Sequence, residues 1–209
     1  MLAGTGNGKR YIFIRAAAVL FVLLEMLFIT GCRGKSDYDE TLIRILKKGK
    51  IESDIVEPFG ENYYDEAELT EMLNESAREY NEKAGEKDCV SIEDIRVAKD
   101  IARVVIVYRD SSDYAEFNKV DFFYGTVSEA LSNGFDLNMT MLSLEDGRKK
   151  GFAELSGIAD SHIVILSEPI LVETNSDIKY VSANVEYLDE THARMSSESS
   201  GLACIVLEK

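Results

Sequence analysis

The sequence predicts an α+β fold for residues 41–209: a single compact domain with a mainly antiparallel sheet, one long amphipathic helix and two short helices. Short β-rich runs separated by turn residues fill most of the chain after residue 137. Residues 65–84 instead keep a helical period. No repeat of fixed period occurs, which excludes solenoids and propellers. A signal segment (residues 1–31) and a polar tether (residues 32–40) precede the domain.

Residues 41–46 and 50–57 are β-rich and predict a first hairpin. Lys47-Lys48-Gly49 lies between the two runs, and its glycine suits a tight turn. Pro58 closes the second run, because proline cannot donate to a strand ladder.

Residues 65–84 predict the long helix. Acidic residues at its start suit the positive end of the helix dipole, and Gly85 is a stop signal. The apolar residues form one stripe with a period of 3.6: Leu69, Met72, Leu73, Ala77, Tyr80 and Ala84. Such a stripe indicates a face that packs on a core, and we expect the helix to lie across a sheet that includes residues 101–108.

Residues 90–98 and 101–108 predict a second hairpin around Lys99-Asp100. Val104 to Val107 form a continuous apolar run, which is typical of a central strand covered on both faces.

Two short helices follow this hairpin. Ser111 or Ser112 opens the first, which extends to Phe117. Residues 126–129 form a capping box that opens the second, and Gly134 ends it. Further strands are predicted at residues 139–144, 162–166, 170–173, 178–181, 185–188 and 204–207. Residues 196–201 predict a flexible loop.

The charge of the chain excludes one class of partner. The formal net charge is −15, and the charged residues of the signal segment sum to +2, which leaves −17 on residues 32–209. Such a surface repels nucleic acid and anionic lipid headgroups, so no nucleic-acid partner is expected.

The most informative motif precedes the domain. Lys9, Arg10 and Arg15 form a basic segment, and an apolar run follows it at residues 16–29. The run ends in four residues that resemble the lipobox of a bacterial lipoprotein signal peptide: Ile29, Thr30, Gly31 and Cys32. The resemblance implies cleavage before Cys32, a lipid on its sulfur, and a location on the outer face of the cell membrane.

Two alternatives are an uncleaved membrane anchor and a simple secretory signal. A membrane span needs about 20 apolar residues, whereas fewer separate Arg15 from Arg33, and Glu25 lies among them. A simple secretory signal would not require a cysteine at position 32. A thiol can take a diacylglyceryl group as a stable thioether, and two or more acyl chains hold a protein at a membrane.

Two blocks within the domain support the same location. Residues 63–69 and 117–126 resemble uncharacterised lipoproteins of anaerobic Gram-positive gut bacteria, and the resemblance extends over most of residues 41–209. The resemblance implies a lipid-anchored location and implies no enzymatic activity.

Signatures of common enzyme chemistry are missing from the sequence. His162 and His192 are far apart and there is no CxxC pair, so we expect no metal site and no cofactor. Ser176 and Lys179 match the SxxK motif of serine acyl-enzymes, but they bridge a turn and a strand, where their side chains diverge. The sequence therefore assigns no catalytic residue.

Cys89 and Cys204 lie in apolar, strand-like runs. This environment favours two buried thiols, because free cysteine behaves as a small hydrophobic residue. A disulfide between them is the alternative.

These observations favour a non-enzymatic, lipid-anchored envelope protein that binds a protein or glycan partner or has a structural role. The alternative is a small extracytoplasmic hydrolase built from dispersed carboxylates, since 38 acidic residues offer many pairs.

Phe123 is the candidate binding residue, because residues 122–125 are the densest aromatic run after the signal segment. Side chains alternate along a strand, so one aromatic face could stay open to a partner. The structural alternative places one face of the run in the core and the other under a neighbouring helix.

Overall fold

The computed structural model describes residues 39–198 and 200–209, of which residues 41–209 form one compact unit. The signal segment, Cys32, residues 33–38 of the tether and Ser199 lie outside the described residues. Within the described part of the chain, no helix is long and apolar enough to cross a membrane.

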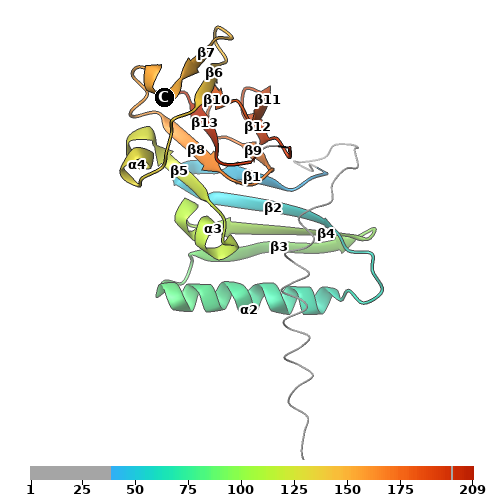
Figure 1. Cartoon of the computed structure of the whole chain (residues 1–209). Helices are drawn as coiled ribbons and strands as arrows, with labels where there is room; N and C mark the ends of the chain where they lie inside the picture. Colours follow the sequence, from blue (N-terminus) through green and yellow to red (C-terminus); the bar gives the residue numbers. More distant parts are fainter. Residues whose placement is uncertain (1–38, 199) are drawn as a thin grey trace, which may run out of the picture. The chain divides into compact units, whose positions relative to one another are not determined.

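Two sheets and three α-helices make up the described domain (Figure 1). The first sheet has the order β11 (Val185–Asp189), β12 (His192–Met195), β9 (Leu171–Glu173), β1 (Leu42–Ile45), β2 (Ile51–Pro58), β4 (Ile101–Tyr108), β3 (Val90–Ala98). The second has the order β5 (Phe122–Thr126), β8 (His162–Leu166), β13 (Ala203–Leu207), β10 (Ile178–Ser182), β6 (Thr140–Ser143), β7 (Lys149–Gly151). The β1–β9 pair is parallel and the other described pairs are antiparallel, so the predicted fold class is confirmed.

The helices are α2 (Glu66–Ala84), α3 (Ser111–Asn118) and α4 (Val127–Ser132), and two single 3₁₀ turns are η2 (Lys47–Gly49) and η3 (Phe152–Glu154). The local signals explain their ends. The Asp65 side chain accepts hydrogen bonds from the first-turn amides of α2, and Gly85 ends this helix with a left-handed φ of 73°. Thr126 and Glu129 form the predicted capping box of α4.

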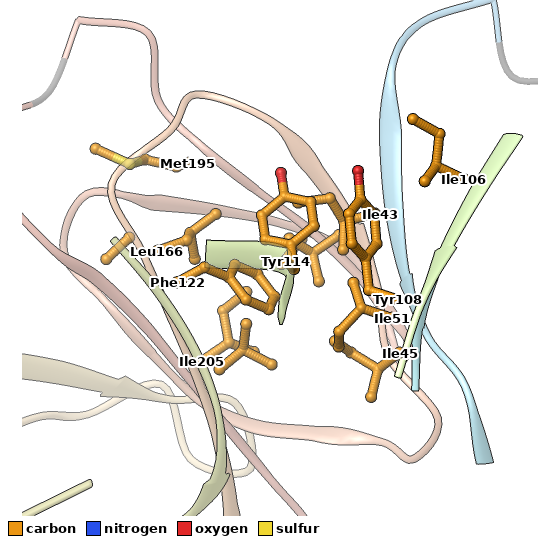
Figure 2. Close-up of a cluster of buried hydrophobic side chains, with 14 of the residues drawn as sticks. Ile43, Ile45, Ile51, Ile106, Tyr108, Tyr114, Phe122, Leu166, Met195 and Ile205 are labelled. Carbon is orange, nitrogen blue, oxygen red and sulfur yellow. The ribbon is translucent and has the colours of Figure 1, made fainter. Parts of the chain in front are cut away.

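The larger hydrophobic cluster joins both sheets, α2 and α3. Leu73 and Ala77 are the buried residues of α2, and they pack in this cluster with Val90 of β3 and Ile106 of β4. The predicted packing of the helix on this sheet is therefore confirmed. Figure 2 shows the centre of the cluster, where aromatic rings from β4, α3 and β5 lie among isoleucines of both sheets. The labelled rings are Tyr108, Tyr114 and Phe122.

The second sheet is buried on both faces, because alternate residues of its central strands enter different clusters. Val164 and Leu166 of β8 belong to the larger cluster, whereas Ile163 and Ile165 belong to a smaller one. The smaller cluster also contains Val127, Ala130, Leu137, Phe152 and Ile158, which come from α4, η3 and the intervening loops. Period-two alternation therefore fixes the register of this sheet.

The prediction that the strand at residues 104–107 is covered on both faces is wrong in part. Val104 and Ile106 are buried, but Val105 and Val107 are half-buried on the opposite face, which also carries Arg103. The strand is central, between β2 and β3, yet its outer face carries an ion-pair network. The apolar stripe of α2 also ends one turn earlier than predicted, since Ala84 is exposed.

Cys89 and Cys204, the cysteines of the described domain, are free and buried. Cys89 belongs to the larger cluster and Cys204 to the smaller one, so they lie in different cores. The preferred prediction of two buried thiols is confirmed.

Candidate functional site

The structure places Phe123 in β5, where neighbouring side chains alternate between the two cores. Phe122 is 5% exposed and packs in the larger cluster, while Phe123 is half-buried against the smaller cluster. The ring of Phe123 lies 5.2 Å from that of Phe135. This arrangement matches the structural alternative for the aromatic run, and a binding role for Phe123 stays a prediction.

The residue types that carry most enzyme chemistry are committed to structural contacts. Burial raises the pKa of the Cys89 thiol, and it raises the pKa of Cys204 to about 12, so neither thiol ionises near neutral pH. The Nδ1 atom of His192 lies 2.8 Å from an Asp189 oxygen, which holds the pKa of Asp189 below its usual range. His162 is exposed and its ring stacks on that of Tyr124, with the centroids 5.2 Å apart.

Burial raises the pKa of four carboxyl groups among the described residues, and three of them have a polar partner on another element. A raised pKa in a carboxyl is one mark of an acid catalyst, but structural pairs also produce it. The contacts are Arg103 Nη1 to Asp54 (3.2 Å), Tyr80 OH to Asp113 (3.0 Å) and Tyr114 OH to Glu168 (3.1 Å). These partners tie neighbouring elements together, which favours a structural role for all three carboxyls.

Arg44 is the centre of the ion-pair network on the outer face of the first sheet. Its guanidinium donates hydrogen bonds to Glu173 (2.8 Å) and Glu52 (2.6 Å) and lies 3.6 Å from Asp54. The Arg44 side chain is only 12% exposed, so these pairs are poorly screened by solvent. The network links β9, β1 and β2 across the sheet.

An exposed apolar surface gathers instead where β2 leads into α2. We call it the aromatic corner and define it as Pro58, Phe59, Tyr63, Tyr64 and Ile101. The rings of Phe59 and Tyr64 stack with their centroids 4.8 Å apart, and Tyr63 meets Tyr64 edge-on at the same distance. Tyr63 is 67% exposed and Ile101 is 45% exposed.

Two strand ends hold this loop in place. Pro58 is the register partner of Ile101, and the amide of Phe59 donates a 2.7 Å hydrogen bond to the carbonyl of Asp100. A side chain on Gly60 would meet Asp100 at 2.8 Å, so only glycine allows this close approach. Figure 1 shows the β2–α2 loop and the β3–β4 turn at the same end of the first sheet. The loop is therefore anchored at its start by the hairpin and at its end by the Asp65 cap of α2.

Acidic groups surround the aromatic corner. Burial raises the pKa of Glu57 to about 7, so this carboxyl at the base of the loop is partly protonated at neutral pH. Partial burial and the neighbouring Tyr63 raise the pKa of the Tyr64 hydroxyl, which therefore remains a neutral donor. Glu61, Asp65 and Asp100 are exposed around the same loop.

The aromatic corner can bind a partner through surface contacts of its side chains. Tyrosine contributes a large, rigid apolar area and a hydroxyl, at a low cost in conformational entropy. Sequence reasoning noticed residues 63–69 only for a resemblance and did not select them as a site. Three aromatic residues, Phe59, Tyr63 and Tyr64, in a loop that follows Pro58 and contains Gly60 are a usable signal, because such a loop cannot bury them as a regular strand does.

Comparison with protein-family models, with curated proteins and with solved structures finds no match for the chain.

Proposed function

We propose that this chain is a lipid-anchored protein on the outer face of the cell membrane, and that its domain binds a protein partner through the aromatic corner. The lipobox at residues 29–32 supports the anchor. The observation that carries the binding role is Tyr63, which is 67% exposed and whose ring lies edge-on to that of Tyr64, itself stacked on Phe59. The role requires no catalysis.

The composition of the corner favours a protein over a glycan. Pro58 and its register partner Ile101 add exposed aliphatic surface at the strand ends that anchor the aromatic loop. A surface that mixes aliphatic and aromatic side chains with a polar rim is typical of a protein interface. A sugar-binding surface depends more on one open ring and several hydrogen-bonding groups around it. Tyrosine is also among the residues that contribute most to binding energy at protein interfaces.

The alternative is a hydrolase with dispersed carboxylates, and the raised pKa of Glu57 is the observation that fits it best. A carboxyl with a pKa of about 7 can serve as a general acid. The raised pKa of Glu57 has one cause, burial, which the loop and strand around it supply. If Glu57 were catalytic, Glu57→Gln would abolish hydrolysis of any substrate that the parent turns over, whereas a binding module would show no turnover to lose.

The binding role is tested by photocrosslinking in living cells. A benzophenone amino acid replaces Tyr63 in the full chain, and a matched variant carries it at Leu131, which is 55% exposed on α4. We expect a discrete, protease-sensitive adduct from position 63 and none from position 131. An adduct that only a glycan-cleaving enzyme removes would identify a sugar ligand instead. Equal adducts at both positions, or none at position 63, would contradict the proposal.

A further inference from the structure

The four sheet edges of the described domain differ in how they are protected. The edge strand β5 lies against both α3 and α4, and β7 has only three residues, two of which are lysines. β3 carries a bulge between Ile92 and Asp94 and exposed charged side chains. Short strands, charges, bulges and covering elements are the usual protection against strand addition. β11 also carries a bulge, between Tyr187 and Asp189, and exposed carboxylates, but among these four described edges it is the one that exposes large apolar side chains, namely Tyr187 and Leu188.

The hydrogen-bonding pattern shows which backbone groups of β11 face outward. The amide of Ser196 donates to the carbonyl of Asn184 at 3.0 Å, so Asn184 points toward β12. Groups alternate in an antiparallel ladder, and the register pairs Glu186 with Arg194 and Tyr187 with Ala193. The N–H and C=O groups of Glu186 therefore also face β12, while those of Val185 and Tyr187 face away from the sheet.

The charge of this edge defines the partner that fits it. Residues 183–191 contain Glu186, Asp189 and Glu190, all exposed, and no lysine or arginine. A second copy of the chain would bring the same carboxylates against them, with a formal charge of −17 on residues 32–209 of each copy. Like charges directly opposite destabilise a strand pair, and opposite charges stabilise it. A basic strand therefore fits where a second copy does not.

We propose that β11 binds an extended, basic peptide segment by strand addition. The backbone groups of Val185 and Tyr187 hydrogen bond to the added strand. Tyr187 and Leu188 contact its apolar side chains, and Glu186 and Glu190 pair with its lysine or arginine residues. This site uses neither the residues nor the strand ends of the aromatic corner, so it stands or falls separately from the proposed function.

The test uses two dye-labelled peptides and the full chain purified in detergent. One peptide alternates lysine with valine, and the other alternates glutamate with valine. Fluorescence anisotropy should show that the lysine peptide binds and the glutamate peptide does not. Equal binding of the two peptides, or no binding of the lysine peptide, would overturn the proposal.

Two substitutions at one position test the backbone mechanism. Tyr187→Pro removes an outward-facing N–H, which an edge strand tolerates, and Tyr187→Thr keeps it while also removing the ring. We expect Tyr187→Pro to bind the lysine peptide about tenfold more weakly than Tyr187→Thr, which corresponds to about 1.4 kcal/mol. Equal affinity of the two variants would show that the edge amide is not used.

Hydrogen exchange keeps the test decisive if Tyr187→Pro fails to fold. In the parent chain, the lysine peptide should slow amide exchange within residues 185–189 and leave residues 58–65 of the aromatic corner unchanged. Protection at residues 58–65 alone would place the peptide at the corner and would exclude β11 as its site.

Discussion

Phe123 and Tyr63 show how the same kind of side chain takes different roles at different positions. Phe123 alternates with Phe122 and Tyr124 along β5, so its ring enters the smaller core beside Phe135. Tyr63 lies in a loop without a strand neighbour to cover it, and its ring stays 67% exposed. The contribution of each ring to stability follows from this burial rather than from its chemistry.

We therefore expect Phe123→Ser and Tyr63→Ser to differ in stability. Loss of the Phe123 ring should lower the free energy of unfolding by about 3 kcal/mol, the lower end for a core aromatic, because the ring is half-buried. Loss of the Tyr63 ring should lower it by less than about 1 kcal/mol. Urea denaturation of both variants measures the difference. A stable Phe123→Ser variant that loses a co-purifying partner would restore Phe123 as a binding residue.

Glu57 should make the stability of the domain depend on pH. An unfolded glutamate titrates near 4.5, whereas Glu57 titrates at about 7 in the folded state. The folded state therefore holds an extra proton between these values, so stability is greatest below the lower value and falls as pH rises through the higher one. Because Glu57 is only half-buried, solvent screening limits the effect to about 1–2 kcal/mol.

Glu57→Gln isolates this effect from the other carboxyls. The free energy of unfolding of the parent, relative to that of the variant, should fall by about 1–2 kcal/mol between about pH 5 and about pH 8. Urea denaturation of both proteins at the two pH values measures this change. Parallel pH profiles of parent and variant would mean that Glu57 has an ordinary pKa.

At the scale of the element, local chemistry predicted the helices and most of the strands but missed β7 and β12. Asp65, Gly85 and the Thr126 capping box all mark helix ends by hydrogen bonds that involve only nearby residues. The strands β7 and β12 have three and four residues. Runs of this length are too short to show a period of two, and their pairing with distant strands is a tertiary effect that a local pattern does not contain.

The half-exposed outer face of β4 was missed for a related reason. Val105 and Val107 are apolar in the sequence, but their neighbours on that face include Arg103 and, across the strand pair, Asp54. Only the register of β2 against β4 places the two charged residues together. The aromatic corner has the same origin, because the pairing of β4 with β2 sets Ile101 opposite Pro58, directly before the aromatic loop.

The packing of α2 yields a sharp expectation for this element. Leu73 is 7% exposed in the larger core, and Leu73→Asp would bury a charge that has no partner there. Such a change should cost several kcal/mol and abolish folding. Asn74→Asp is the matched control, because Asn74 is exposed on the next position of the same helix. Circular dichroism melts compare the two, and a cooperative melt of Leu73→Asp near that of the parent would show that this face of α2 does not support the core.

At the scale of the whole molecule, the fold of the domain and the location of the protein are separate questions. The described domain buries its own cores with two sheets and α2, and its surface carries most of the net negative charge. A surface of that charge is repelled by anionic lipid headgroups, so it cannot by itself hold the protein at a membrane. The proposed membrane attachment therefore rests on the hydrocarbon chains that a lipidated Cys32 would supply.

Cys32→Ala should separate membrane attachment from the folding of the domain. The variant lacks the sulfur that would form the thioether, so it should remain as full-length precursor, or be released if another peptidase cleaves it. The parent should fractionate with membranes, because two or more acyl chains bind stably at roughly 0.8 kcal/mol per buried CH₂ group. Mass spectrometry of the amino-terminal peptide decides the matter: a diacylglyceryl-modified Cys32 is expected, and an unmodified terminus that begins at another residue would refute the lipid anchor. The domain itself should melt at the same temperature in parent and variant, because the core residues that the structure describes lie between Leu42 and Leu207.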